Sequence, residues 1–123
     1  MGEALQHASE RQDDVDIDGV KAAIDRALVM RTGLPPYSEL VELHQTLRWH
    51  IRTLLPLAEA RVERMDRGTV DWYDRRCRLN TIPHRVARGL GSGLQSADDH
   101  VRSLGYSCKF LLENSGLTPE SDQ

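Results

Sequence analysis

The sequence is poor in aromatic residues and in cysteine. It has two Trp, three Tyr and one Phe in 123 residues, so we expect a core built mainly from Leu, Val, Ile and Ala. Its two cysteines, Cys77 and Cys108, lie too far apart for the spacing of a local metal knuckle. Both fall on or beside apolar stripes, and we interpret each as a small, reduced and buried hydrophobic residue.

Long apolar runs are absent as well. No stretch approaches the roughly 18 residues that a membrane-spanning helix needs. The N-terminus is polar and acidic, which is the reverse of a signal peptide. We therefore expect a cytoplasmic protein with no membrane partner.

Charge of one sign does not dominate the whole chain. The formal net charge is −3, which argues against a surface built throughout to hold polyanions. Residues 1–19 carry six acidic residues against Arg11, a balance of −5, which leaves the rest of the chain at about +2. That remainder is rich in Arg, and Lys21 and Lys109 are its lysines. A bias in composition explains this as readily as phosphate binding does.

The length predicts one domain with two tails. Residues 1–15 are polar, acidic and without sustained periodicity, so we interpret them as a disordered tail. Residues 16–114 carry the helical patterns and form the expected domain. Residues 115–123 are interpreted as a disordered C-terminal tail.

The most regular pattern lies in residues 38–65. Read as a helix that Ser38 caps, this stretch places eight apolar residues on one face, at steps of three and four: Leu40, Leu43, Leu47, Ile51, Leu54, Ala58, Val62 and Met65. Pro56 removes one backbone hydrogen bond, at a cost of about 3 kcal/mol if nothing compensates for it. The stripe keeps its phase across Pro56, which favours one kinked helix over two. Its apolar face needs other segments to cover it.

Three further helices are expected. Asp16 or Asp18 can cap the first, which has Gly33 just past its end, and Thr69 after the turn at Gly68 can cap the third. Pro83 either kinks or splits the third helix, and the last one starts near Ser96. The expected inward residues are Val20, Ile24, Ala27 and Leu28, then Trp72, Leu79, Ile82, Val86 and Leu90, then Ala97, Val101, Leu104, Cys108 and Leu111. No segment alternates like a strand, so the sequence predicts an all-α four-helix up-down bundle.

Two runs of residues resemble a family of small uncharacterised actinobacterial proteins. They are LPPYSEL at 34–40 and LRWHIRTLLPLAE at 47–59, and the similarity extends over about 33–112. Members of that family are commonly linked to natural-product biosynthesis. The resemblance implies a helical fold and a cytosolic, actinobacterial setting, and it supplies no catalytic residues. The acidic N-terminus and Pro83 depart from the family's layout.

One candidate site lies before Pro56. Arg48 and Arg52 are one turn apart on a helix, so together they can hold an anionic ligand or an acidic partner helix. Trp49 and Trp72 can act as anchors for a protein partner. Alternatively, the arginines form surface ion pairs and the tryptophans cover the ends of the core.

A second candidate is the basic part of the third helix, with Arg75, Arg76, Arg78, Arg85 and Arg88. A helix that carries these residues can lie on a phosphate backbone. Against this, Asp71 and Asp74 precede the run, and neither helix-turn-helix spacing nor interleaved aromatic residues accompany it. A solvated charged face is the structural alternative.

Metal and nucleophilic sites are not expected. The Glu-x-x-His pairs of a di-iron bundle are absent, and the histidines are scattered along the chain, at His44, His50, His84 and His100 among others. No phosphate-binding glycine loop with a following Lys-Ser/Thr occurs. We therefore predict no metal and no cofactor.

Three hypotheses about function remain open. The leading one is a non-enzymatic interaction or accessory protein with a protein partner or a second copy of itself. The others are a nucleic-acid-binding regulator that uses the third helix, and a small-molecule-binding protein or enzyme with a pocket between helices near Trp49 and Trp72.

Overall fold

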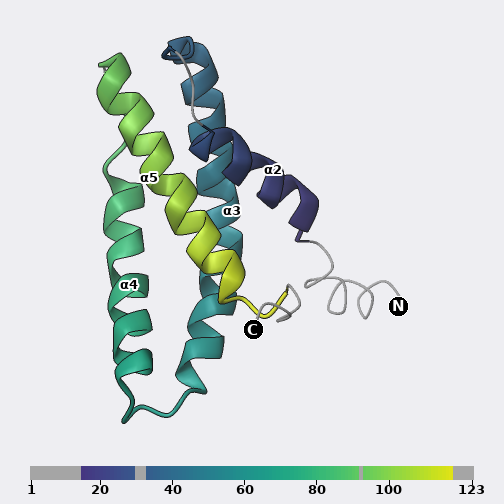
Figure 1. Ribbon diagram of the computed structural model, residues 1–123, viewed down its shortest axis with the longest axis vertical. Coiled ribbons are helices and arrows are strands. Elements are labelled where there is room, and N and C mark those ends of the chain that lie inside the picture. The colour runs from purple at the N-terminus through teal and green to yellow at the C-terminus, as the bar shows by residue number, and fades with distance from the viewer. Residues whose placement is uncertain (1–14, 30–32, 92, 118–123) are drawn as a thin grey trace, which may run out of the picture.

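The computed structural model describes residues 15–29, 33–91 and 93–117. It contains four helices: α2 (Ile17–Leu28), α3 (Tyr37–Glu63), α4 (Val70–Ala87) and α5 (Leu94–Glu113) (Figure 1). No strand occurs in the described ranges, so the predicted all-α four-helix fold is confirmed. The predicted tails at 1–15 and 115–123 lie mostly outside the described residues.

The helices alternate in direction along the chain (Figure 1). α3 is the longest and runs the full height of the molecule, while α5 crosses it and α2 lies obliquely beside both. α4 returns alongside the second half of α3. None of the helices in the described ranges combines the length and the apolar character that a membrane-spanning segment needs.

The apolar stripe of α3 is the centre of the core. Its seven helical members are buried, as predicted, and His44 is buried with them: Leu40, Leu43, Leu47, Ile51, Leu54, Ala58 and Val62. Met65 lies past the helix end and is partly buried. Ser38 is not the cap, because the helix already begins at Tyr37. The N-cap residue is Pro36, which has an extended backbone and makes no side-chain hydrogen bond to the helix.

Both internal prolines lie within continuous helices. Pro56 is inside α3, which confirms the single long helix, and Pro83 does not split α4. Both proline residues are exposed, so they lie on the solvent faces of their helices. There, water can hydrogen-bond to the carbonyl group that a proline leaves unpaired.

The packing of α2 against α5 depends on Gly105. A Cβ atom at this position would lie 2.7 Å from the Cβ atom of Ala27, so only glycine allows the two helices to approach this closely. Arg102 of α5 also donates a hydrogen bond of 3.3 Å to the carbonyl oxygen of Leu28, the last residue of α2. α2 ends at Leu28, earlier than the sequence predicted, since Gly33 was expected just past its end.

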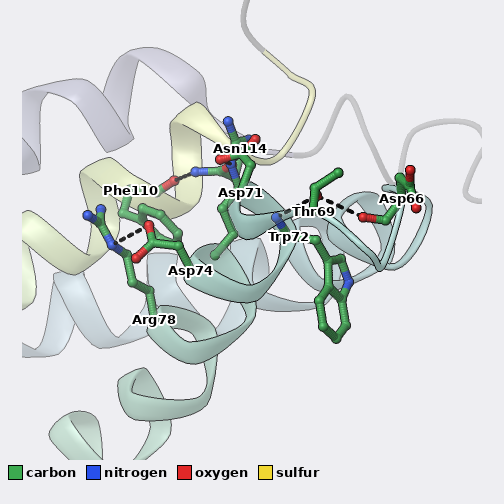
Figure 2. A network of polar contacts seen from close by, with 9 residues as sticks. Asp66, Thr69, Asp71, Trp72, Asp74, Arg78, Phe110 and Asn114 are labelled. Carbon is green, nitrogen blue, oxygen red and sulfur yellow. Dashed lines mark hydrogen bonds and ion pairs between the residues drawn. The ribbon is translucent and has the colours of Figure 1, made fainter.

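The α3–α4 turn is held by two side chains. The Thr69 hydroxyl accepts a hydrogen bond of 3.1 Å from the Trp72 amide, which confirms the predicted cap (Figure 2). Asp66 accepts one of 3.1 Å from the Gly68 amide. Positive φ angles occur at Gly89, Gly91 and Gly116, whereas Gly68 forms its turn without one.

The last helix starts two residues before Ser96. α5 begins at Leu94 after Gly93, and the Ser96 hydroxyl donates to the Gly93 carbonyl from inside the first turn. The predicted inward residues of this helix, Ala97, Val101, Leu104, Cys108 and Leu111, are buried.

Candidate functional site

Helix α4 contributes little to the core. Only Leu79 and Ile82 among its residues are buried, although Trp72 and Val86 pack partly against the core. On its outer side, Val70 is 83 % exposed and Tyr73 is 65 % exposed. Of the four helices, α4 therefore has the largest share of unburied side chains available for contact.

Arginines dominate the side of α4 that meets α5. Arg75, Arg78, Ile82 and Arg85 follow one another at helical steps of three and four, and helix bundles usually place apolar residues at such positions. Arg75 donates a hydrogen bond of 2.6 Å to the Asn114 side chain. Arg85 donates one of 2.9 Å to the Ser107 hydroxyl. We call this contact between the two helices the α4–α5 seam.

The middle of the seam places Arg78 against an aromatic ring. The Arg78 guanidinium carbon lies 5.4 Å from the centre of the Phe110 ring, within the range of a cation–π contact. Figure 2 shows the Arg78 guanidinium group beside both Phe110 of α5 and Asp74 of its own helix. The ion pair with Asp74 is 3.4 Å long and well exposed, so it neutralises the arginine only weakly.

The long polar side chains leave two hollows beside α4. One lies in the seam, has a volume of about 260 Å³ and is lined by Arg78, Thr81, Ile82, Arg85, Tyr106, Ser107 and Phe110. The other, of about 340 Å³, lies where the ends of α3 and α5 meet the start of α4, and is lined by Arg61, Val62, Arg64, Met65, Arg75 and Asn114. Both therefore combine guanidinium groups with apolar side chains.

The arginines proposed for nucleic-acid binding do not form one free row. Arg75 pairs with Asp71 at 3.1 Å and Arg76 pairs with Glu63 at 3.5 Å. Arg78 and Arg85 contact α5, while Arg88 is exposed just beyond the end of α4. Most of these guanidinium groups already contact other parts of the fold.

The four proposed partner-binding residues are in two places. Arg48, Trp49 and Arg52 are exposed on α3, with Trp49 at 62 %. Trp72 instead lies partly buried at the α3–α4 turn, where the Arg67 guanidinium carbon is 5.9 Å from its ring centre. Trp49 is 14 residues before the end of α3, which is about 20 Å at 1.5 Å per residue. The two tryptophans therefore do not form one site.

Sequence reasoning missed a contact between two histidines. His44 of α3 and His100 of α5 lie with their ring centres 5.2 Å apart and their planes tilted by 48°. Both Nε2 atoms are buried and have no hydrogen-bond partner among the described residues. The spacing of His44 from Leu40 and Leu47 already placed it on the apolar stripe, but nothing local pointed to His100.

Burial is the main influence on this histidine pair. It lowers the pKa of both imidazoles, because the charged form loses hydration. His100 and Arg48 lower the pKa of His44 further, and Arg88 and Arg85 lower that of His100. The pair is therefore neutral at pH 7, with arginines from α3 and α4 close to it.

The two cysteines differ, and one prediction about them was wrong. Cys108 is buried in α5, and burial raises its pKa to about 12. Cys77 is exposed on α4, one turn after Tyr73 and on the same outer side. A hydrogen bond with Cys77 raises the pKa of Tyr73. No group of three or more His, Cys, Asp or Glu side chains in the described ranges is arranged to hold a metal ion.

Comparison with known protein families gives a match over most of the chain. The model of a family of unknown function, DUF6415, matches residues 18–119, from the first turn of α2 to beyond the end of α5. No curated protein and no solved structure matches.

Proposed function

The chain belongs to the DUF6415 family of unknown function, and we propose that it is a non-enzymatic helical interaction protein that binds an acidic segment of a partner protein at the α4–α5 seam. The observation that carries this proposal is the line of arginines at a helix contact where apolar residues are expected. Arginines at a helix contact stabilise a bundle poorly, but their guanidinium groups bind carboxylates well.

The charges of the seam favour an acidic partner. The hydrogen bond from Arg85 goes to the neutral Ser107 hydroxyl, so this contact leaves its positive charge uncompensated. Arg78 has only a weak, exposed pair with Asp74. Two aromatic residues lie beside these charges: Phe110, and Tyr106 at 57 % exposure. Arginine with exposed aromatic residues is the composition that is enriched in protein interfaces.

The size of the hollow favours a partner's side chains over a free small molecule. Pockets for drug-sized ligands have volumes of about 300–1,000 Å³. The seam hollow, at about 260 Å³, is below that range, and the second hollow, at about 340 Å³, is near its lower end. The small-molecule or enzyme alternative near Trp49 and Trp72 also has less support, because these residues are far apart.

The nucleic-acid alternative keeps one supporting feature, the positive charge of α4. It has less support because the pairs with Asp71, Glu63 and Asp74 have to break, or share their arginines, before phosphates can bind. A short DNA duplex, titrated in the same way as the peptide described below, tests this alternative. Binding that falls steeply with salt and shows no preference for peptide would favour this alternative.

The seam can be tested with a defined probe. ¹⁵N-labelled protein is titrated with a short peptide of Glu, Asp, Leu and Phe, and backbone shifts are mapped along the chain. We expect saturable shifts around Arg78 and Tyr106, and a loss of affinity of about tenfold or more in Arg78→Glu. Arg67→Glu is the matched control, because it makes the same charge change at the α3–α4 turn, outside the seam.

Two results would reject the seam as the binding site. One is an absence of saturable shifts at the seam, and the other is equal affinity for the wild type, Arg78→Glu and Arg67→Glu. The same variants also serve as baits in native lysate. A physiological partner should be retained by wild type and Arg67→Glu but lost from Arg78→Glu.

We further propose that the partner acts in actinobacterial natural-product biosynthesis or its regulation. The support for this is the resemblance carried by residues 34–40 and 47–59. Deleting the gene in its native host should then change the profile of secreted natural products, and an unchanged profile would argue against it. A second copy of the chain is the other candidate partner, and sedimentation measurements over a range of concentrations would reveal a dimer.

A further inference from the structure

The His44–His100 pair lies outside the seam hollow and serves no evident structural purpose. Burying a polar nitrogen without a hydrogen bond costs stability, and here two such nitrogens lie in neighbouring rings. His44 is only 7 % exposed. An apolar residue at either position would pack the α3–α5 contact without this cost, so the pair suggests a ligand that hydrogen-bonds to both imidazoles.

The groups around the pair indicate the charge of that ligand. Arg48 follows His44 by one turn on α3, and the charges of Arg85 and Arg88, at the end of α4, lower the pKa of His100. Two helices, α3 and α4, therefore carry the guanidinium groups, and the two imidazoles lie on α3 and α5. Three positive charges oppose a metal cation, which would also need further ligands beyond two histidines. They attract an anion.

The number of donors indicates the kind of anion. Arginine donates in a planar fork that suits tetrahedral and planar oxyanions, and a protonated imidazole adds one N–H donor from each ring. Arg48 and Arg88 are exposed and have flexible stems, so they can rearrange around a bound group. A carboxylate has two oxygens for these donors, whereas a phosphoryl group offers at least three.

We propose that His44, His100, Arg48 and Arg88 form a site for a small phosphate, either inorganic phosphate or the phosphoryl group of a monoester, while Arg85 stays on Ser107 in the seam. The anion accepts hydrogen bonds from both Nε2 positions and from the arginines. It also compensates for the charge that the imidazoles gain when they take up protons. Phosphate binding and proton uptake are then coupled.

The test uses inorganic phosphate and the full chain at pH 6.5. Imidazole nitrogen resonances report the protonation of each histidine, and chloride keeps the ionic strength constant. We expect saturable shifts of His44 and His100 with net proton uptake by calorimetry in two buffers. His84, which is exposed on α4, serves as the internal control and should not respond.

Variants separate the site from general charge effects. Arg88→Gln and His100→Gln should each weaken phosphate binding by about tenfold, the usual effect of losing one charge-assisted contact. Arg52→Gln is the matched control, because it removes the same charge one turn after Arg48 and should stay within about twofold of the wild type. Arg88 is exposed, so its substitution tests the site even if a histidine variant fails to fold.

Three results would overturn the proposal. They are phosphate shifts that chloride reproduces at equal ionic strength, equal phosphate affinity in Arg88→Gln and the wild type, and binding of Zn²⁺ at the pair without binding of phosphate. Phenyl phosphate distinguishes free inorganic phosphate from the phosphoryl group of a monoester as the ligand. If it binds as well as inorganic phosphate, the site accepts a phosphoryl group on a larger molecule, and if only inorganic phosphate binds, the ligand is free phosphate.

Discussion

Helices α4 and α5 have 18 and 20 residues but are held in the fold by different forces. α5 buries nine residues and packs against α2 and α3 through apolar contacts. α4 buries two, and its contacts with α5 include three arginines. Similar length therefore says little about a helix's role, and what matters is whether its inward positions are apolar or charged. The predictions below test this contrast.

The largest difference is expected in the reactivity of the two cysteines. Cys77 on α4 is exposed, whereas Cys108 on α5 is buried and its pKa is raised to about 12. In native protein a thiol reagent should modify Cys77 at least about 10³-fold faster than Cys108, which reacts only when the core opens. Rates measured for Cys77→Ser and Cys108→Ala separate the two sites. Comparable rates would mean that α5 is not packed as described.

Truncation of side chains should give the next largest contrast. Leu104 of α5 is fully buried, so Leu104→Ala should lower the free energy of unfolding by about 2–5 kcal/mol. Val70→Ala on α4 is the control, because that side chain is 83 % exposed and its loss should change stability by less than about 0.5 kcal/mol. Urea unfolding followed by circular dichroism measures both, and a similar loss in the two variants would contradict the contrast.

The close approach of α2 and α5 predicts a smaller effect. Gly105→Ala places a methyl group 2.7 Å from the Cβ atom of Ala27, and the resulting shift should cost about 1–3 kcal/mol. The higher helix propensity of alanine offsets up to about 1 kcal/mol of this. Gly33→Ala, where nothing lies within 4 Å, is the control. Thermal unfolding that leaves Gly105→Ala as stable as the wild type would show that the helices can separate at little cost.

The smallest effect is expected from pH, because His44 and His100 are already neutral at pH 7. Burial lowers the pKa of both below the unfolded value of about 6.5, so below that pH the unfolded state binds more protons than the folded state. Stability should therefore be complete above pH 6.5 and fall as the pH drops below it. Arg48, Arg85 and Arg88 strengthen this trend.

A variant isolates the contribution of the pair to the pH dependence. The double variant combines His44→Gln with His100→Gln. His50, whose pKa burial also lowers, is present both in this variant and in the wild type, so it does not contribute to the difference between them. The double variant should therefore lose less stability than the wild type between pH 7 and pH 5, as measured by urea unfolding. A steeper loss in the variant would reverse the sign worked out above.

The sequence predicted the positions of the helices better than the contacts that each helix makes with the others. The stripes of α3 and α5 are long enough to fix which residues are buried, since each repeats over about four turns or more. The stripe of α4 is weak, so the position of Cys77 was predicted on the wrong side. The contact of Arg102 with the end of α2 was not predicted, because Arg102 is 74 residues after Leu28 in the sequence.

The candidate sites depended even more on contacts between distant residues. The basic residues of the third helix were identified from sequence, but their partners on α5 were not, because helical spacing gives no information about the neighbouring helix. His44 and His100 come together only through the packing of α3 on α5. The separation of Trp49 from Trp72 likewise follows from the length of α3.

One hydrogen bond bears on how α4 keeps its place with so few buried residues. The Tyr37 hydroxyl, at the start of α3, donates to the carbonyl oxygen of Gly91 in the connection that follows α4. At its other end, α4 is joined to α3 by the turn capped by Thr69. Both ends of α4 are therefore tied to α3. A partner that binds at the seam thus meets a helix whose two ends are already positioned by α3.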